Sequence, residues 1–101
     1  MRSPSRQSSQ RDAQPRTPAS DLVRLLQARH GITAGRGPEP GRVVARDGSR
    51  TVTVALVGGR WFRQHTSRDG RRALSPLASV GGEWLVAREV AAELIEARAV
   101  E

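Results

Sequence analysis

The chain of 101 residues lacks cysteine, lysine and tyrosine, and it contains only three aromatic residues. The absence of cysteine excludes a disulfide framework, a thiolate metal site and a thiol nucleophile. No apolar run approaches the roughly 18 residues that a membrane-spanning helix requires, and the N-terminal stretch has no apolar signal segment. From these absences we expect a cytoplasmic protein with no membrane partner.

The sequence also lacks the usual signatures of catalysis and of metal binding. Its two histidines, His30 and His65, fall on different predicted elements, and neither has an HxxxH partner or a carboxylate cluster beside it. Ser67 and Asp69 follow His65 closely, but catalytic triads are assembled from distant segments, and a tight turn explains the same letters. No phosphate-binding glycine motif is present. We therefore expect no metal, no cofactor and no enzymatic activity.

A chain of this length has room for one small domain and a tail. Residues 1–19 contain almost nothing that can enter a hydrophobic core and are rich in arginine, serine, glutamine and proline. We expect a disordered basic arm over residues 1–19 and a single small α+β domain over residues 20–101. The arm would either raise affinity for nucleic acid without base specificity or act only as a spacer.

A helix is predicted at each end of this domain. Ser20 precedes an apolar stripe as a candidate N-cap, and Gly31 follows that stripe as a candidate C-terminal cap, which gives a first helix of about ten residues. A second helix, of about fifteen residues, begins after Gly82. The buried face predicted for it consists of Trp84, Ala87, Val90, Ala91, Leu94 and Ala97, and the opposite face holds Arg88, Glu89, Glu93 and Glu96.

Between the helices, two turn sequences, Asp47-Gly48 and Gly58-Gly59, separate three runs rich in β-branched and aromatic residues. They predict antiparallel strands near residues 42–46, 50–57 and 60–66. The predicted partners are Val43 with Val54, Ala45 with Val52, Val54 with Arg63, Ala55 with Phe62, Leu56 with Trp61, and Val57 with Arg60. The predicted fold is therefore α+β: a helix, a three-stranded antiparallel meander and a helix, with both helices on one face of the sheet.

The segments outside these strands are predicted to be connections. Residues 32–41 form a loop because proline and glycine recur at close intervals. Residues 67–82 form a long connection, of which Leu74, Leu77 and Val80 are expected to enter the core.

Alternation of side chains along a strand assigns the two faces of the meander. The core face is predicted to hold Val43, Ala45, Val52, Val54, Leu56 and Trp61. Arg63 and His65 also fall on this face, where we expect them near its rim and in reach of water. A bulge in the third strand would exchange Trp61 with Phe62, and alternation alone leaves that possibility open.

In its order of elements, the segment 20–100 resembles the double-stranded-RNA-binding domain. Members of that family contact RNA with the first helix, with the loop between the first two strands (here residues 46–50) and with a lysine-rich start of the last helix. Here the last helix opens with Arg88 opposed by Glu83 and Glu89. The resemblance is one of topology alone, and the sequence does not favour duplex RNA as the ligand.

Positive charge is concentrated before the last helix. Residues 1–72 hold 15 arginines and five acids, a net charge of +10, whereas residues 73–101 hold two arginines and five acids, a net charge of −3, which sums to +7. The outer sheet face and the following turn are therefore a candidate nucleic-acid site, in which arginines bind phosphate and the phenylalanine stacks on a base. Its residues are Arg42, Arg46, Arg50, Arg60, Phe62, Arg68, Arg71 and Arg72.

The same arginines are also consistent with two alternatives to nucleic-acid binding. A codon bias toward arginine or a need for solubility would produce a charged sheet face without a ligand. Alternatively, the domain is a structural or protein-interaction module, as a homodimer or with another protein, and it uses the exposed sheet or the glutamate-rich last helix.

Overall fold

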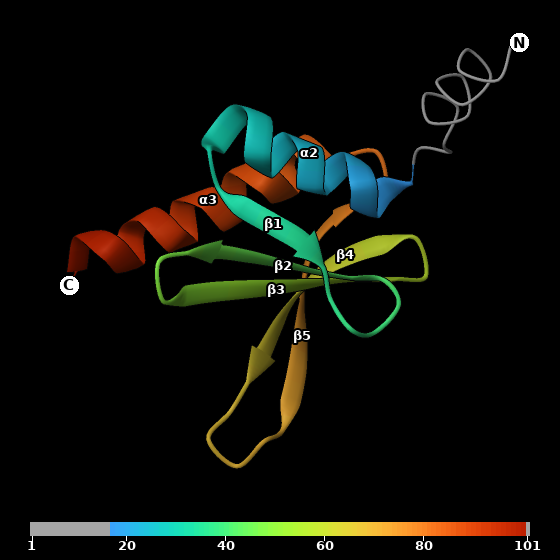
Figure 1. Ribbon diagram of the computed structural model, residues 1–101. Helices are drawn as coiled ribbons and strands as arrows, with labels where there is room; N and C mark the ends of the chain where they lie inside the picture. The colour runs from blue at the N-terminus through green and yellow to red at the C-terminus, as the bar shows by residue number, and fades with distance from the viewer. Residues whose placement is uncertain (1–16, 101) are drawn as a thin grey trace, which may run out of the picture.

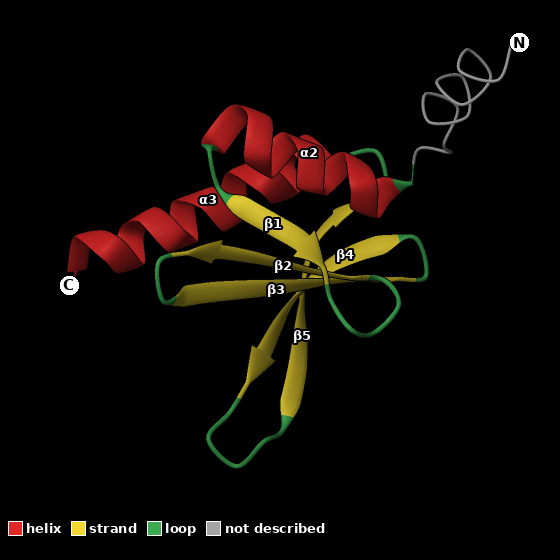
Figure 2. Ribbon diagram, viewed as in Figure 1, coloured by secondary structure: helices red, strands yellow, loops and turns green. Residues whose placement is uncertain are grey.

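The computed structural model describes residues 17–100, which form two helices and one five-stranded antiparallel sheet (Figures 1 and 2). The elements, in chain order, are α2 (Pro18–His30), β1 (Thr33–Arg36), β2 (Arg42–Asp47), β3 (Arg50–Val57), β4 (Arg60–Thr66), β5 (Arg72–Ser79) and α3 (Glu83–Val100). Both helices lie on the same side of the sheet, and the strands follow one another in the sheet as they do in the chain. The α+β prediction is confirmed, but the sheet has five strands where three were predicted.

The three central strands agree with the prediction. Every predicted pair across the β2–β3 and β3–β4 hairpins is present in the register, including Ala45 opposite Val52 and Leu56 opposite Trp61. Five of the six residues assigned to the core face are buried, and the sixth, Leu56, is partly buried against the core. Alternation and turn chemistry therefore determine this part of the sheet.

The two edge strands are the features that the sequence prediction missed. β1 lies in the segment expected to be a loop and pairs with β2, and β5 lies in the expected long connection and pairs with β4. Both have weak local signals, because β1 is only four residues long and contains a glycine, and β5 contains Pro76. Each edge strand is therefore stabilised by its hydrogen bonds to a neighbouring strand, and not by a strong strand propensity of its own residues. With five strands, the topology no longer resembles the double-stranded-RNA-binding domain.

Helix α2 begins earlier than predicted. Its N-cap is Thr17 rather than Ser20, and the two side chains form a reciprocal capping box in which each accepts a hydrogen bond from the other's backbone N–H. Pro18 occupies the first turn, where its missing N–H costs nothing. The C-terminal cap is Gly31, as predicted, with a left-handed φ of 63°. Residues 1–16 of the predicted arm lie outside the described residues.

The phase of α3 differs from the prediction at its first turn. Ala87, Val90, Ala91 and Leu94 face the sheet as expected, and Val86 joins them with no exposed surface. Trp84, however, is exposed, and the preceding residue, Glu83, is buried in its place. The side chain of Ala97 lies outside the described residues. A large aromatic side chain favours burial, but the buried stripe of this helix is complete without Trp84.

The core lies between the two helices and the inner face of the sheet, around the fully buried Trp61. Leu74 and Val80, which were expected to enter this core, are exposed, whereas Leu77 packs against it in part. The sheet does contain a bulge near Trp61, but the additional residue is on β5, because Trp61 pairs with Ala78 and Phe62 pairs with Pro76. Trp61 therefore keeps its place on the inner face.

The β4–β5 hairpin extends beyond the rest of the sheet. The β3–β4 register ends at Thr53 opposite Gln64, whereas β4 continues to pair with β5 as far as Thr66 opposite Arg72. The end of the β4–β5 hairpin consequently projects from the sheet, on the side away from the helices (Figure 1).

Neither helix in the described part of the chain is long and apolar enough to cross a membrane.

Candidate nucleic-acid interface

The arginines of the predicted site are distributed over three different turns of the sheet. Arg46 and Arg50 flank the β2–β3 turn, Arg60 follows the β3–β4 turn, and Arg68, Arg71 and Arg72 lie on the β4–β5 hairpin. In Figure 1 these turns are at the left, the right and the bottom of the molecule. The structure therefore does not bring the eight predicted residues together, and three of the five exposed arginines of the predicted site lie on the hairpin.

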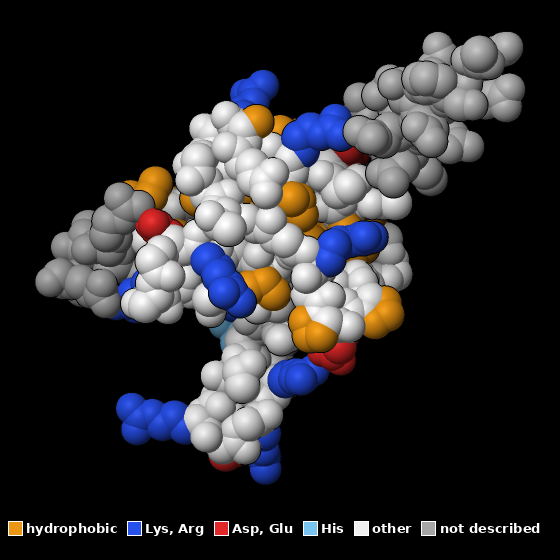
Figure 3. Space-filling view, in the orientation of Figure 1, with side chains coloured by type: hydrophobic (Ala, Val, Ile, Leu, Met, Phe, Trp, Pro, Cys, Tyr) orange, Lys and Arg blue, Asp and Glu red, His pale blue; other side chains and the backbone are white. Residues whose placement is uncertain are grey.

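The hairpin end presents Arg68, Arg71 and Arg72 to solvent. Figure 3 shows blue arginine side chains that project from this end of the molecule in different directions. Arg68 has no hydrogen bond or ion pair with any residue that the structure describes, and Arg71 has one weak ion pair, with Asp69 at 3.4 Å between Nε and Oδ2. A ligand can therefore approach the guanidinium groups of Arg68 and Arg71 without first breaking a strong internal contact.

The turn itself is held together by the residues that resemble a catalytic triad in the sequence. Asp69 accepts hydrogen bonds from the Ser67 hydroxyl and from the Arg71 backbone N–H, and Ser67 also donates to the Arg71 carbonyl at 3.2 Å. The hydroxyl of Ser67, followed by the Arg71 N–H, lowers the pKa of Asp69 below its ordinary value of 3.8. These contacts are those of a tight turn, and His65 bonds to a different serine.

The start of β5, at the hairpin end, is linked to the loop between β1 and β2. Glu39 in this loop accepts a hydrogen bond from Arg72 at 3.0 Å, so that one of the hairpin arginines is paired with a carboxylate. The loop is anchored at Gly41, whose carbonyl accepts from the Leu56 N–H at 2.7 Å. Gly41 has a φ of 73°, and a Cβ atom at this position would lie 2.8 Å from the Leu56 carbonyl oxygen. Glycine is therefore required where the loop crosses β3.

The outer face of the sheet is less open than alternation predicted. Alternation places Ala55 and Phe62 on this outer face, but Ala55 is fully buried and Phe62 is partly buried. Arg42 donates from Nε to Gln64 Oε1 at 3.0 Å and contacts the Pro40 carbonyl at 3.4 Å. Arg42 and Phe62 thus belong to a partly closed surface, and they are less available to a ligand than the hairpin arginines are.

A polar cleft of about 350 Å³ opens where β4 leaves β3. It is lined by Thr51, Thr53, Arg63, Gln64, His65 and Thr66. Most of these side chains offer hydroxyl, amide or imidazole groups, and few offer apolar surface. The sequence does not predict this cleft, because threonines on the outer face of a strand are common in solvated sheets. The one local signal for it was the run of polar residues from Arg63 to Thr66.

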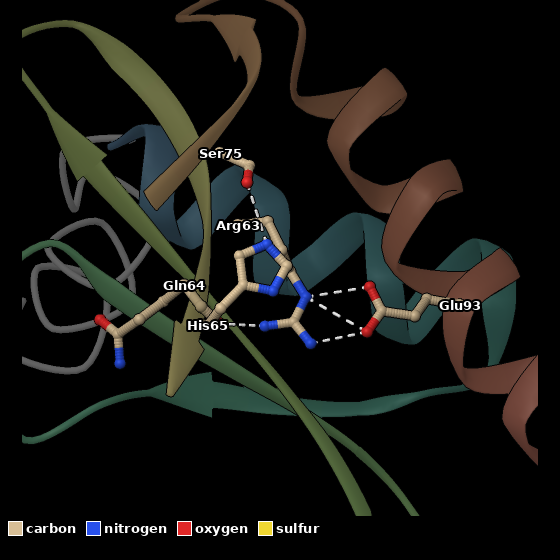
Figure 4. A network of polar contacts seen from close by, with 5 residues as sticks. All are labelled: Arg63, Gln64, His65, Ser75 and Glu93. Atoms are coloured by element: carbon tan, nitrogen blue, oxygen red, sulfur yellow. Dashed lines mark hydrogen bonds and ion pairs between the residues drawn. The ribbon is translucent and has the colours of Figure 1, made fainter. Parts of the chain in front are cut away.

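A network on the inner side supports the wall of this cleft (Figure 4). Arg63 donates to both carboxylate oxygens of Glu93 on α3, with Nε–Oε1 at 2.9 Å and Nη2–Oε2 at 2.6 Å, and also to the Gln64 carbonyl. The Arg63 hydrogen bond is the main reason why the pKa of Glu93 lies below its ordinary value of 4.5, although partial burial opposes it. His65 Nε2 lies 3.0 Å from Ser75 Oγ on β5. Arg63 and His65 therefore face the rim of the core, as predicted, and are held there.

A buried polar pair joins the sheet to the start of α3. The indole Nε1 of Trp61 donates to Glu83 Oε2 at 2.8 Å, and the Gly81 N–H also donates to this carboxylate at 3.1 Å. No buried side-chain nitrogen or oxygen in the described residues lacks a hydrogen-bond partner. The pair is thus a satisfied structural contact rather than an open catalytic group.

The described residues contain no group of three or more histidine, cysteine, aspartate or glutamate side chains that converge on one point. The sequence matches no model of a known protein family, and no curated protein and no solved structure matches the chain. The hypothesis about function therefore rests on the geometry and charge of this chain alone.

Proposed function

We propose that the protein is a non-enzymatic nucleic-acid-binding module that binds the phosphate backbone with the projecting end of its β4–β5 hairpin. The observation that carries this proposal is the concentration of three exposed arginines, Arg68, Arg71 and Arg72, on a hairpin that extends beyond the sheet. A narrow two-stranded projection of this kind can enter the major groove of a duplex. The planar guanidinium group also suits phosphate oxygens well.

The cleft at the base of the hairpin supports the same proposal. Its hydroxyl and amide groups lie beside the arginines, so that they are in a position to bond to sugar or base edges once phosphates are held. Phe62 is a weaker candidate for base stacking than the sequence suggested, because it is already partly buried. Arg42, Arg46, Arg50 and Arg60 lie away from the hairpin end and would add long-range attraction rather than direct contact.

The proposal is tested by titrating labelled single-stranded and duplex DNA and RNA with the protein at several salt concentrations. A surface that contacts phosphate predicts that log affinity falls linearly with log salt, with a slope of about −0.9 for each contact to duplex DNA. Arg68→Glu removes one guanidinium group from this surface, so it should lower the affinity and reduce the size of the slope by about 1.

The matched control is Arg36→Glu on β1, which changes the net charge equally. Arg36, like Arg68, is exposed and has no ion pair with any other residue the structure describes. It should lower the affinity much less than Arg68→Glu does. Equal losses of affinity for the two variants would contradict a specific role of the hairpin, and no binding at low salt would overturn the proposed function itself.

A further inference from the structure

Trp84 is placed at the surface although it is one of only two tryptophans in the chain. It lies on the first turn of α3 and is 59% exposed, more than any other large apolar side chain in the described part of the chain. Glu83 occupies the adjacent inward position and bonds to Trp61, so the core has no place for the second indole. The guanidinium of Arg88 lies 5.8 Å from the centre of its ring. The indole is thus held at the surface and does not contribute to the core.

A pocket of about 350 Å³ lies beside this indole, between α2 and the start of α3. Leu25 and Ala28 of α2 supply apolar surface to it, and Gly81 borders it. Val80, which precedes Gly81 in the chain, is 46% exposed. A tryptophan next to an apolar depression is the kind of feature that contributes most of the binding energy in protein interfaces. We call the pocket and Trp84 together the Trp84 face.

The charges around the Trp84 face have both signs. Arg24 and Arg29 line the pocket, and so does Asp21. The carboxylate of Glu83 also reaches the pocket, but it is already bonded to Trp61 and Gly81. The face thus carries an acid among its arginines, whereas the hairpin end is dominated by arginine. A surface that carries both an acid and two bases around an apolar centre is instead complementary to itself.

We infer that the Trp84 face is the contact surface of a homodimer with twofold symmetry. In an isologous contact the same patch meets itself, so Trp84 of each copy packs into the pocket of the other copy. The same rotation can bring Asp21 of one copy opposite an arginine of the other, which uses both signs of charge. This inference stands on the apolar and charged surface of the helices and does not depend on the proposed nucleic-acid binding.

The dimer would leave the hairpins free. The helices and the hairpin end lie on opposite sides of the sheet (Figure 1), so that a contact through α2 and α3 directs the two hairpins outward. Two linked binding units bind a polymer more tightly than one, because the second contact is intramolecular.

Sedimentation velocity of the full chain over a range of concentrations, up to well above the micromolar range, tests the dimer. The expected result is a mass that rises to twice the monomer mass of 11.0 kDa. Trp84→Ser should hold the protein at the monomer mass throughout. Ala28→Glu, on the exposed side of α2, should do the same by placing a bulky charge in the pocket. The control is Ile95→Ser, which removes a similarly exposed apolar residue, 54% exposed, elsewhere on α3 and should leave the dimer intact.

Tryptophan fluorescence gives a second readout on the wild-type chain. Trp61 is already buried, so the fraction of emission that acrylamide quenches reports on Trp84. That fraction should fall as the dimer forms, in the same concentration range as the change in mass. A wild-type chain that stays monomeric would overturn the inference. So would a dimer that persists in both Trp84→Ser and Ala28→Glu, or quenching of Trp84 by oligonucleotides in a monomeric protein.

Discussion

At the scale of single residues, the structure depends on a few polar contacts in which buried or partly buried polar side chains are hydrogen-bonded. Glu83 is the charged residue buried in the described core, and it accepts from Trp61 and from Gly81. The sequence showed a glutamate next to a tryptophan at the start of a helix, but it gave no sign of which of the two would turn inward. Only the position of Trp61 across the core decides this, because its indole N–H requires an acceptor.

Removal of this acceptor should destabilise the fold. Glu83→Ala leaves the Trp61 indole N–H and the Gly81 N–H without a partner, and we expect the free energy of unfolding to fall by about 1–3 kcal/mol. Glu83→Gln keeps an acceptor oxygen and should cost less. Urea denaturation of both variants, with the exposed Glu89→Ala as a control, measures the difference. A wild-type stability for Glu83→Ala would show that water replaces the carboxylate.

The Arg63–Glu93 pair should make stability depend on pH in acid. The pKa of Glu93 is lowered in the folded protein, so the pair contributes stability fully above the ordinary value of 4.5 and loses it as the pH falls through the folded value. Since Glu93 is 46% exposed, solvent screens the pair, and we expect a contribution of at most about 1 kcal/mol. In the Glu93→Gln variant, the melting temperature should therefore fall less steeply as the pH drops below 4.5. Melting curves from neutral pH to pH 3 test it, and an unchanged acid slope would argue against the pair.

At the scale of elements, the sequence predicts those strands whose signals are local. β2, β3 and β4 are joined by two-residue turns and alternate between polar and apolar residues, so both their limits and their register are predictable. β1 and β5 are edge strands with weak propensity, and each is stabilised by a partner that is already part of the sheet. The projecting hairpin could not be predicted for this reason, since it exists only because β5 pairs with β4 beyond the end of the β3–β4 register.

The end of this hairpin should be separable from the stability of the fold. Thr66 pairs with Arg72, so residues 67–71 can be replaced by the two-residue turn Asn-Gly while the strands keep their register. We expect the melting temperature to change by only a few degrees, because the exposed turn contributes nothing to the core. Affinity for nucleic acid should fall by at least about tenfold. Calorimetry and the binding titration measure the two effects. A large loss of stability would show that the turn is required for folding.

At the scale of the whole molecule, charge is distributed unevenly over the surface. The exposed face of α3 carries Glu89, Glu93 and Glu96, whereas the hairpin end on the other side of the sheet is basic. Such a distribution orients a molecule as it approaches a polyanion and repels the wrong orientation. The division of charge along the sequence already indicated this polarity, but only the fold separates it in space.

Neutralising two of these glutamates should change the rate of association and little else. Glu89→Gln with Glu96→Gln removes repulsion between α3 and a nucleic acid, and we expect the association rate to rise by roughly two- to tenfold at low salt. The difference should disappear at high salt, where charges beyond the Debye length are screened. Stopped-flow measurements at several salt concentrations test this. An increase that persists at high salt would indicate that α3 contacts the ligand directly.

The sequence by itself determined the helices and the central hairpins, because capping, turn chemistry and side-chain periodicity all act between residues close together in the chain. It also determined that the arginines dominate the first 72 residues. The tertiary structure alone decided which edge strands form, which of Glu83 and Trp84 is buried, and which arginines gather on one projection. These outcomes depend on partners far away in the chain, such as β4 for β5 and Trp61 for Glu83, and no local pattern encodes the distance between them.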